Sequence, residues 1–323
     1  MNNMPDNTSQ SSMENPKTEV LCDVLILGAG PAGLTAAIYA ARSRLLTIVL
    51  DASMTGGLVA TTFQIANYPG VSGVIGGNDL MANMKNQAVS FGAEIRDMQK
   101  MGSVRLEGEE KIIETESATY RSRTVIIATG AEPRKLPIPE ESAYRSRGIH
   151  YCATCDGALY QDAEVMVVGG GISALEEAEF LTRFARHVTL VNRAEVFRAP
   201  AGITKHVLGL PGISVRYHSR IEGVSGDVFV SAAILRDLAT GRTEEVPVEG
   251  IFVYIGSQPD ASRFGAALQV SASGFILAGE DMKTSISGVF AAGDIREKPI
   301  RQITTAVSDG TIAAVMAERF LAG

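Results

Sequence analysis

One segment near the start of the chain constrains the fold more than any other. An apolar run over residues 20–27 predicts a buried strand, the turn GAGPAG follows it, and an alanine-rich helix pattern runs to about Arg44. A second predicted strand over residues 47–50 ends at Asp51. Strand, GxGxxG turn, helix, strand and acidic residue in this order form the dinucleotide-binding fingerprint in the context that it requires. The alternative is a glycine turn in an ordinary α/β core.

The glycines of this turn have separate tasks. Gly28 makes the tight turn, Gly30 lets the backbone approach a pyrophosphate, and Gly33 permits close packing of helix on strand. The pyrophosphate would sit on the helix N-terminus, where free N–H groups and the helix dipole favour an anion. Asp51 is placed to accept hydrogen bonds from ribose hydroxyls.

A second unit of the same kind begins at Glu164. A predicted strand over residues 165–168 leads into the turn GGGISA, which has the form GxGxxA. A helix to about Ala185 and a strand over residues 188–191 follow. Two such units in one chain predict two dinucleotides, one held permanently as a flavin and one exchanging as a nicotinamide.

The residues after the second unit favour NADP over NAD. Where an acidic residue would bind a ribose 2′-hydroxyl, the sequence has Asn192 and Arg193, and Arg198 lies further along. Two arginines can pair with a 2′-phosphate. The alternative is that they are solvated side chains at a strand end. The last segment adds a predicted strand over 289–292, a tight turn with Asp294 as a candidate acceptor for a ribityl chain, and a helix near 305–321.

Composition bears on the remaining classes of function. A chain of 323 residues is long enough for two domains. The net charge of −7 and the lack of a basic cluster argue against nucleic-acid binding, and no apolar stretch is long enough to predict a membrane span. The first 18 residues are polar and lack the apolar core of a signal peptide, so they predict a disordered tail. The expected compartment is a reducing cytoplasm.

The motif that carries chemistry is CATCD, which places Cys152 and Cys155 around two small residues and Asp156 directly after them. A metal clip, a structural disulfide and a redox pair are the three interpretations. A zinc site normally needs four ligands, and the only other cysteine, Cys22, lies within the first predicted strand. A structural disulfide across so short a loop would constrain little of the unfolded chain. The redox interpretation is therefore favoured, with no metal expected.

These stretches, with further motifs, resemble the low-molecular-weight thioredoxin reductases of the FAD-dependent pyridine nucleotide-disulfide oxidoreductase family. The motifs GAGPAG, TGG…NYPG, IIATGAEPRKL, CATCDG, GGGISALEEAEFLTRFARHVTLV, VYIGSQPD and GVFAAGDI…RQITTA occur in the family's order over residues from about 20 to 323. The resemblance implies an enzyme that passes electrons from NADPH through FAD and the Cys152–Cys155 disulfide to thioredoxin. It also implies a homodimer whose two domains rotate relative to each other.

The resemblance further implies an α/β fold of two Rossmann-like dinucleotide-binding domains, each a three-layer ββα unit, with the second inserted into the first. The FAD-binding domain is expected over 19–131 and 260–323, and the NAD(P)-binding domain, which carries the CxxC, over 132–259. Gly and Pro at 130–133 and 256–260 suit linkers. Residues 1–18 remain the predicted tail.

The resemblance also assigns roles to single residues. Cys155 would be the thiol nearest the flavin, Cys152 the thiol that attacks thioredoxin, and Asp156 the acid/base, although a first-turn or N-cap acid is its alternative role. FAD contacts are expected at Gly28, Gly30, Pro31, Ala32, Gly33, Asp51, Gly57, Leu58, Asn67, Thr129, Gly130, Gly293, Asp294, Arg301, Gln302 and Ile303. NADP contacts are expected at Gly169, Gly171, Ser173, Ala174, Asn192, Arg193, Arg198 and Gly256.

Three departures from the family pattern keep alternatives open. Leu58 replaces a Gln, Ile172 replaces an Asp or Asn, and the 2′-phosphate signature HRRxxxR is reduced to Asn192, Arg193 and Arg198. A charge-assisted hydrogen bond contributes about 1.5–3 kcal/mol, so one lost arginine would weaken the preference for NADPH about tenfold or more. Ferredoxin or NADH are the alternative electron donors, and a small-molecule disulfide is the alternative substrate. A flavin- or metal-binding regulator without catalysis is the alternative from another class.

Overall fold

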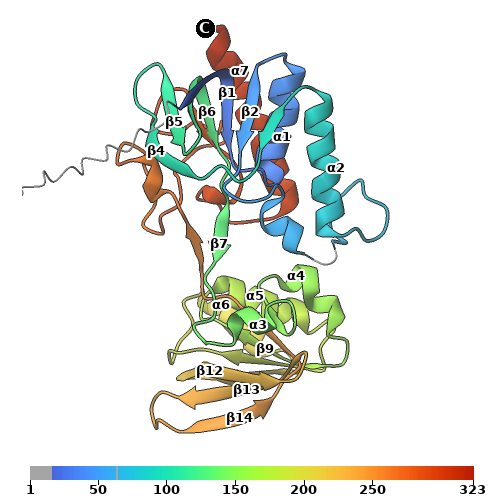
Figure 1. Cartoon of the computed structure of the whole chain (residues 1–323). Coiled ribbons are helices and arrows are strands. Elements are labelled where there is room, and N and C mark those ends of the chain that lie inside the picture. The colour runs from blue at the N-terminus through green and yellow to red at the C-terminus, as the bar shows by residue number, and fades with distance from the viewer. Residues whose placement is uncertain (1–16, 63–64) are drawn as a thin grey trace, which may run out of the picture.

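The computed structural model describes residues 17–62 and 65–323 and consists of two lobes (Figure 1). Each lobe is built on its own parallel sheet, so the predicted α/β fold is confirmed. Of the predicted tail, residues 1–16 lie outside the described residues. The next residues already belong to the fold, because strand β1 begins at Thr18 and pairs there with Ala118. Across the two described ranges, no helix combines the length and apolar character that a membrane crossing would need.

The upper lobe in Figure 1 holds a seven-stranded sheet in the order β3-β2-β1-β6-β5-β4, with β17 on the β6 strand. Strands β3, β2, β1, β6 and β17 run parallel, whereas β5 and β4 add an antiparallel edge. The strands are β1 (Thr18–Leu27), β2 (Thr47–Leu50), β3 (Glu94–Arg96), β4 (Met101–Arg105), β5 (Lys111–Thr115), β6 (Ala118–Ile127) and β17 (Val289–Ala291).

Three helices cover one face of this sheet: α1 (Pro31–Arg42), α2 (Gly77–Ser90) and α7 (Ile303–Ala322). Helices α1 and α7 approach closely because a small-residue stripe on α7 faces α1. A Cβ placed on Gly310 would collide with the Ala32 carbonyl oxygen. This packing holds the start of α1, with its glycine turn, against the end of the chain.

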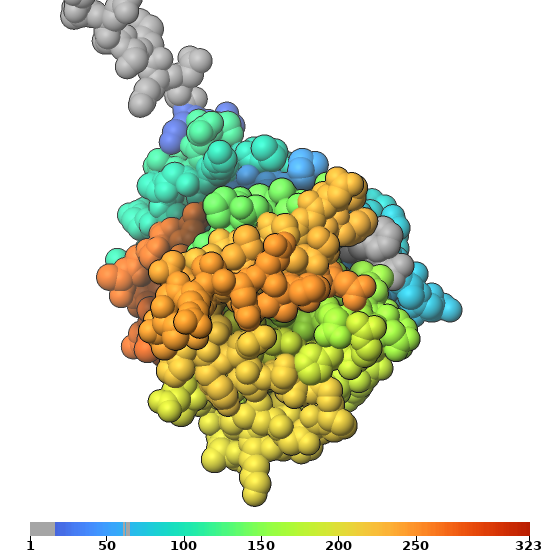
Figure 2. Space-filling view, turned by 90° about the horizontal axis from the view of Figure 1, so that it is seen from below, coloured from blue at the N-terminus to red at the C-terminus, as the bar shows by residue number. Residues whose placement is uncertain are grey.

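The lower lobe has three layers. A parallel sheet in the order β11-β10-β9-β15-β8 lies between helices and the antiparallel sheet β12-β13-β14, whose hairpins form much of the near face in Figure 2. The strands are β8 (Ile149–His150), β9 (Glu164–Val168), β10 (His187–Val191), β11 (Ile213–Arg216), β12 (Ser219–Gly226), β13 (Val230–Asp237), β14 (Thr243–Pro247) and β15 (Gly250–Val253). The helices are α3 (Glu141–Tyr144), α4 (Ala153–Asp156), α5 (Ile172–Leu181) and α6 (Ala201–Leu208).

Two short strands connect the lobes. Strand β7 (Ala131–Pro133) leaves the upper lobe, and β16 (Ser257–Pro259) returns to it, paired antiparallel with β7. The chain then adds β17 to the first sheet, so the second unit is inserted into the first, as expected. The expected domain boundaries fall at this two-stranded ribbon and stay a prediction.

Several helix ends differ from the predicted ones for local reasons. Helix α1 ends before Arg44 because that residue has a positive φ of 61°, which a right-handed helix does not accept. Helix α5 ends at Leu181, and the following turn continues through N–H groups that donate three residues back. Helix α7 begins at Ile303, before the predicted start near Thr305. Gln302 is its N-cap residue, and Thr305 is the third residue of the helix and forms a capping box with Gln302.

Candidate active site

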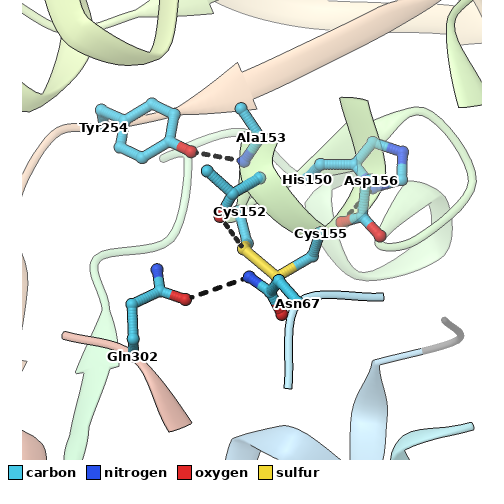
Figure 3. Close-up of a disulfide and its surroundings, with 9 residues drawn as sticks. Asn67, His150, Cys152, Ala153, Cys155, Asp156, Tyr254 and Gln302 are labelled. Carbon is cyan, nitrogen blue, oxygen red and sulfur yellow. Dashed lines mark hydrogen bonds and ion pairs between the residues drawn. A yellow bond between two sulfur atoms is a disulfide. The ribbon is translucent and has the colours of Figure 1, made fainter. Parts of the chain in front are cut away.

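The cysteines of the CxxC motif are joined in a disulfide, Cys152–Cys155, with an S–S distance of 2.05 Å (Figure 3). Cys152 is the N-cap residue of α4 and has an extended backbone conformation. Its carbonyl oxygen accepts hydrogen bonds from the N–H groups of Cys155 and Asp156. The buried Ala153 N–H donates to the Tyr254 hydroxyl at 2.6 Å. A single helical turn thus holds both sulfur atoms, and a side chain from beyond β15 fixes the turn.

Asp156 lies at the end of that turn and is tied to a buried histidine. Its Oδ2 atom is 2.9 Å from His150 Nδ1, and His150 Nε2 is 2.7 Å from the Tyr160 hydroxyl. His150 is 5% exposed and stacks on Phe252. Asp156 is therefore a first-turn acid of α4 and not its N-cap, which is Cys152.

The disulfide adjoins a cavity of about 430 Å³ that both lobes line. Leu58 and Thr62 reach it from the upper lobe, and Cys152, Asp156 and Phe229 from the lower lobe. Leu58 also lines a cavity at the GAGPAG turn, so one side chain borders both spaces. The cavity beside the disulfide and the predicted flavin site are thus separated by the Leu58 side chain, which lines both.

The predicted flavin contacts gather along two adjoining cavities of about 920 and 120 Å³. Gly28, Asp51, Thr129 and Gly130 line both. Three predicted contacts, Gly33, Asn67 and Arg301, line neither cavity. The other predicted contacts line the smaller cavity alone: Gly30, Pro31, Ala32, Gly57, Leu58, Gly293, Asp294, Gln302 and Ile303.

The GAGPAG turn forms an open cradle at the start of α1. Gly28 has a φ of +105°, and a Cβ there would collide with the Ala128 carbonyl oxygen. A Cβ on Gly30, in contrast, would meet no described atom within 4 Å, and no described side chain caps α1. Free N–H groups at a helix start beside a cavity fit a pyrophosphate.

Asp51, which is predicted to bind ribose hydroxyls, also has a structural role in the glycine turn. Its Oδ2 accepts the Ala29 N–H at 2.7 Å, and its Oδ1 accepts the N–H and hydroxyl of Ser53, each at 2.8 Å. The carboxylate therefore braces the glycine turn. Since a carboxylate has about four acceptor sites, it retains capacity for a ribose hydroxyl.

Asp294 presents an unsatisfied acceptor to the smaller cavity. Among the described residues, its buried Oδ1 has no hydrogen-bond partner, and the nearest cation, Lys298 Nζ, is 3.9 Å away. Burial raises the pKa of Asp294 against the opposing charges of Lys298 and Arg301. An orphaned buried oxygen fits a ligand that brings hydroxyl donors, such as the ribityl chain of FAD.

Residues near the end of the chain border the predicted flavin site. Asn67 Nδ2 donates to Gln302 Oε1 at 3.3 Å, and Gln302 caps α7 at the cavity (Figure 3). Arg301 does not line either cavity: its guanidinium lies 4.0 Å from the Phe275 ring centre and donates to the Arg296 carbonyl oxygen. The cation–π contact keeps this side chain away from the space that Gln302 faces.

A separate cavity of about 690 Å³ lies at the second glycine turn. Gly169, Asn192, Arg193 and Arg198 line it, and the Arg198 N–H donates to the Gly170 carbonyl oxygen at 2.6 Å. The other predicted NADP contacts, Gly171, Ser173, Ala174 and Gly256, are not among its lining residues. Ala174 is buried under the turn, where a Cβ on Gly169 would lie 2.9 Å from that of Ala174.

Two further arginines border this cavity, Arg134 and Arg220. Arg220 is brought there by pairing, because the Ser219 N–H donates to the Asn192 carbonyl oxygen at 3.0 Å. Sequence reasoning missed both as nucleotide contacts, because Arg220 is placed by β12 beside the end of β10 and Arg134 by its N–H, which donates to the Gly256 carbonyl oxygen at 2.9 Å. Asn192 itself is buried, and its amide donates to the Val196 carbonyl oxygen, so it shapes the loop.

Cys22 lies apart from this chemistry. It is buried in β1, and burial raises the pKa of its thiol to about 12, so the thiol stays protonated. Among the described residues, no group of three or more His, Cys, Asp or Glu side chains could hold a metal ion.

Comparisons with known proteins agree with the geometry. A family model described as pyridine nucleotide-disulphide oxidoreductase matches residues 22–310. A thioredoxin reductase of Peptoclostridium acidaminophilum is 42% identical over 309 residues, which are 94% of this chain and 98% of that protein. The crystal structure of thioredoxin reductase from Streptococcus pyogenes MGAS5005 has a TM-score of 0.85 at 39% identity, with 94% of this chain and 98% of that chain covered.

A second crystal structure is equally similar in sequence but less similar in its three-dimensional arrangement. Lactococcus lactis thioredoxin reductase, described as the FR conformation, is also 39% identical and covers 93% of this chain and 99% of its own. Its TM-score is 0.67. At equal identity, the lower score indicates that parts of the two structures are arranged differently in space.

Proposed function

Since the chain belongs to the low-molecular-weight thioredoxin reductases of the pyridine nucleotide-disulphide oxidoreductase family, we propose that it reduces thioredoxin with electrons from NADPH, carried through bound FAD and the Cys152–Cys155 disulfide. The observation that carries this proposal is that one residue, Leu58, lies between the predicted flavin site and the disulfide. That side chain lines the predicted flavin cavity and also the cavity beside Cys152. The protein acts as a homodimer in the cytoplasm.

The protein's own residues carry the thiol chemistry. FAD, when bound, supplies two-electron transfer between a nicotinamide and a disulfide. Two electrons and a proton open the disulfide to one thiol and one thiolate. The Cys152 thiolate then attacks a thioredoxin sulfur, and the second thioredoxin sulfur leaves as a thiolate that takes a proton from Asp156. The Asp156 carboxylate then takes the Cys155 proton, and the Cys155 thiolate attacks Cys152. This restores the disulfide and releases the first thioredoxin sulfur as a thiolate, which takes its proton from Asp156 or water.

Access to thioredoxin requires the lobes to move. Cys152 faces a cavity that the upper lobe partly closes through Leu58 and Thr62. The two lobes are joined by the paired strands β7 and β16, a narrow connection suited to a hinge. We propose that rotation about this ribbon alternately presents the disulfide and the nicotinamide to the flavin. The two different TM-scores at equal identity support such mobility in the family.

The proposed donor is NADPH because the second cavity is more basic than its sequence motif indicates. Arg193 and Arg198 come from the motif, and Arg134 and Arg220 supplement them from other elements. A 2′-phosphate is a better partner than a hydroxyl for such a set. Ferredoxin and NADH remain the second candidates, and the observation that favours them is Asn192, whose amide is engaged in its own loop.

The first test is anaerobic reduction of the purified holoenzyme by NADPH and, separately, NADH, followed at the flavin absorption band. Bleaching by NADPH and not by NADH supports the proposal. Failure of both nucleotides, with dithionite still reducing the flavin, would refute it and direct the search to ferredoxin. Turnover with thioredoxin, compared with small disulfides, then decides between a protein and a small-molecule substrate.

A further inference from the structure

The acid at the disulfide is part of a chain of three side chains. His150 ends β8, Asp156 ends α4, and Tyr160 follows the short helix after α4. Both ring nitrogens of His150 are engaged, Nδ1 with Asp156 Oδ2 at 2.9 Å and Nε2 with the Tyr160 hydroxyl at 2.7 Å. The ring is buried and packs on Phe252, and Tyr160 is only partly buried.

The protonation of Tyr160 bears on the tautomer of His150. Burial raises the pKa of Tyr160, and the charges of Asp156 and Glu249 raise it further. Tyr160 is therefore a hydroxyl, which can donate its proton to Nε2 or accept one from it. In the tautomer where Tyr160 donates, the ring proton lies on Nδ1 and points at Asp156.

We propose that His150 is a positioning and proton-sharing residue for Asp156, so that the Asp156–His150 pair acts as one acid at the disulfide, with Tyr160 holding the tautomer. The proposal rests on the proposed thiol–disulfide function. When a thiolate leaves, the Asp156 O–H bond breaks and an S–H bond forms. The Nδ1 proton passes to the carboxylate, and Nε2 takes the Tyr160 proton while the Tyr160 oxygen takes a proton from a water molecule, which is left as hydroxide. No electrons move in these steps.

Other charged groups surround the pair and bear on its titration. Glu249 faces Tyr160, and Glu177 of α5 acts on Tyr254, which itself contacts Ala153 of α4. Arg145 lines the same cavity as His150 and Asp156. None of them makes a described hydrogen bond to the His150 ring or to the Asp156 carboxylate, so His150 is the described side chain that is hydrogen-bonded to that carboxylate.

The test uses His150→Asn and His150→Phe in the FAD-containing protein. The asparagine amide places a donor close to where Nδ1–H stands, so it keeps Asp156 in position without sharing a proton, whereas phenylalanine removes both functions. Disulfide opening by dithiothreitol is followed by alkylation and mass measurement between pH 5.5 and 9. This readout needs neither a nicotinamide nor thioredoxin, so it separates this proposal from the proposed function.

Both variants should open the disulfide about 100-fold more slowly than the wild type below pH 7, which is the low end of general-acid contributions. The difference in rate between the variants and the wild type should become smaller as the pH rises, because an acid catalyst acts only while it is protonated. Asp156→Asn should match them. A wild-type pH profile for His150→Asn would overturn the proposal, since position alone would then suffice.

A second measurement does not depend on a variant. In protein labelled with ¹⁵N-histidine, the His150 resonances, assigned with His150→Asn, should show a protonated Nδ1 and a bare Nε2 at neutral pH. Tyr160→Phe should relax this tautomer preference without unfolding the protein. A ring protonated at Nε2 alone in the wild type would overturn the proposal.

Discussion

Gly33 packs so closely on the Gly28 carbonyl oxygen that no side-chain carbon fits between them. Gly30, three residues earlier on the same turn, faces open space, where a Cβ would meet no described atom within 4 Å. Two glycines of one motif therefore have opposite reasons to be glycine. One is required by packing of α1 on β1, and the other leaves the cavity open for a ligand.

Alanine at these two positions should separate folding from binding. Gly33→Ala should destabilise the protein by about 1–3 kcal/mol, the usual cost of forcing extra carbon into a packed site. Gly30→Ala should fold with an apoprotein melting temperature near the wild type and bind FAD more weakly. Thermal unfolding of the apoproteins and FAD titration measure both effects. Equal losses of stability in the two variants would contradict this division.

Removing one cysteine of the pair should abolish thioredoxin reduction while leaving the flavin site intact. Cys152→Ser and Cys155→Ser should retain FAD, yet take up roughly two fewer electrons per chain in an anaerobic dithionite titration, because the disulfide is a two-electron couple. Cys22→Ser is the matched control, since Cys22 is buried in β1 and has no part in the couple. A full electron count in Cys155→Ser would disprove the assignment.

The sequence predicted the motifs and their order because glycine turns and the CxxC motif act through local backbone requirements. For the same reason it placed the end of the second strand directly before Asp51, and it placed the end of the strand before Asp294 within one residue, since β17 ends at Ala291. It missed Arg220 and Arg134, since their positions follow from strand pairing between segments distant in sequence. It also missed the link of His150 to Asp156, which needs β8 to lie beside the CxxC helix turn.

Asp294 should make the stability of the apoprotein depend on pH. Its folded pKa is raised, mainly by burial, so its contribution is most favourable at low pH and is lost as the pH rises through the folded pKa. Asp294→Asn cannot take the negative charge. The apoprotein of this variant should therefore gain stability relative to wild type at pH 8 and show a smaller difference at pH 4.

Melting temperatures of both apoproteins at the two pH values check this prediction, and the FAD-bound forms provide a second comparison. With FAD bound, Asp294→Asn should lose affinity, because the carboxylate is the stronger acceptor for hydroxyl donors. An apoprotein difference that is the same at pH 4 and pH 8 would show that Asp294 does not titrate as its burial indicates.

Arg220 should contribute to nucleotide choice although no motif contains it. It lines the second cavity and is held by Glu222, which accepts from its Nε at 3.1 Å. Arg220→Ala should raise the KM for NADPH about tenfold, since one charge-assisted hydrogen bond to a phosphate is worth about 1.5–3 kcal/mol. The KM for NADH, which lacks the 2′-phosphate, should change little.

Arg236→Ala is the matched control for Arg220. Arg236 also pairs with Glu222, at 3.4 Å, but it does not line the cavity. Loss of the ion pair alone should therefore leave the KM for both nucleotides near wild type. If Arg236→Ala raised the KM for NADPH as much as Arg220→Ala, the effect would come from the pair with Glu222 and not from a phosphate contact. Equal effects on NADPH and NADH in Arg220→Ala would likewise exclude recognition of the 2′-phosphate.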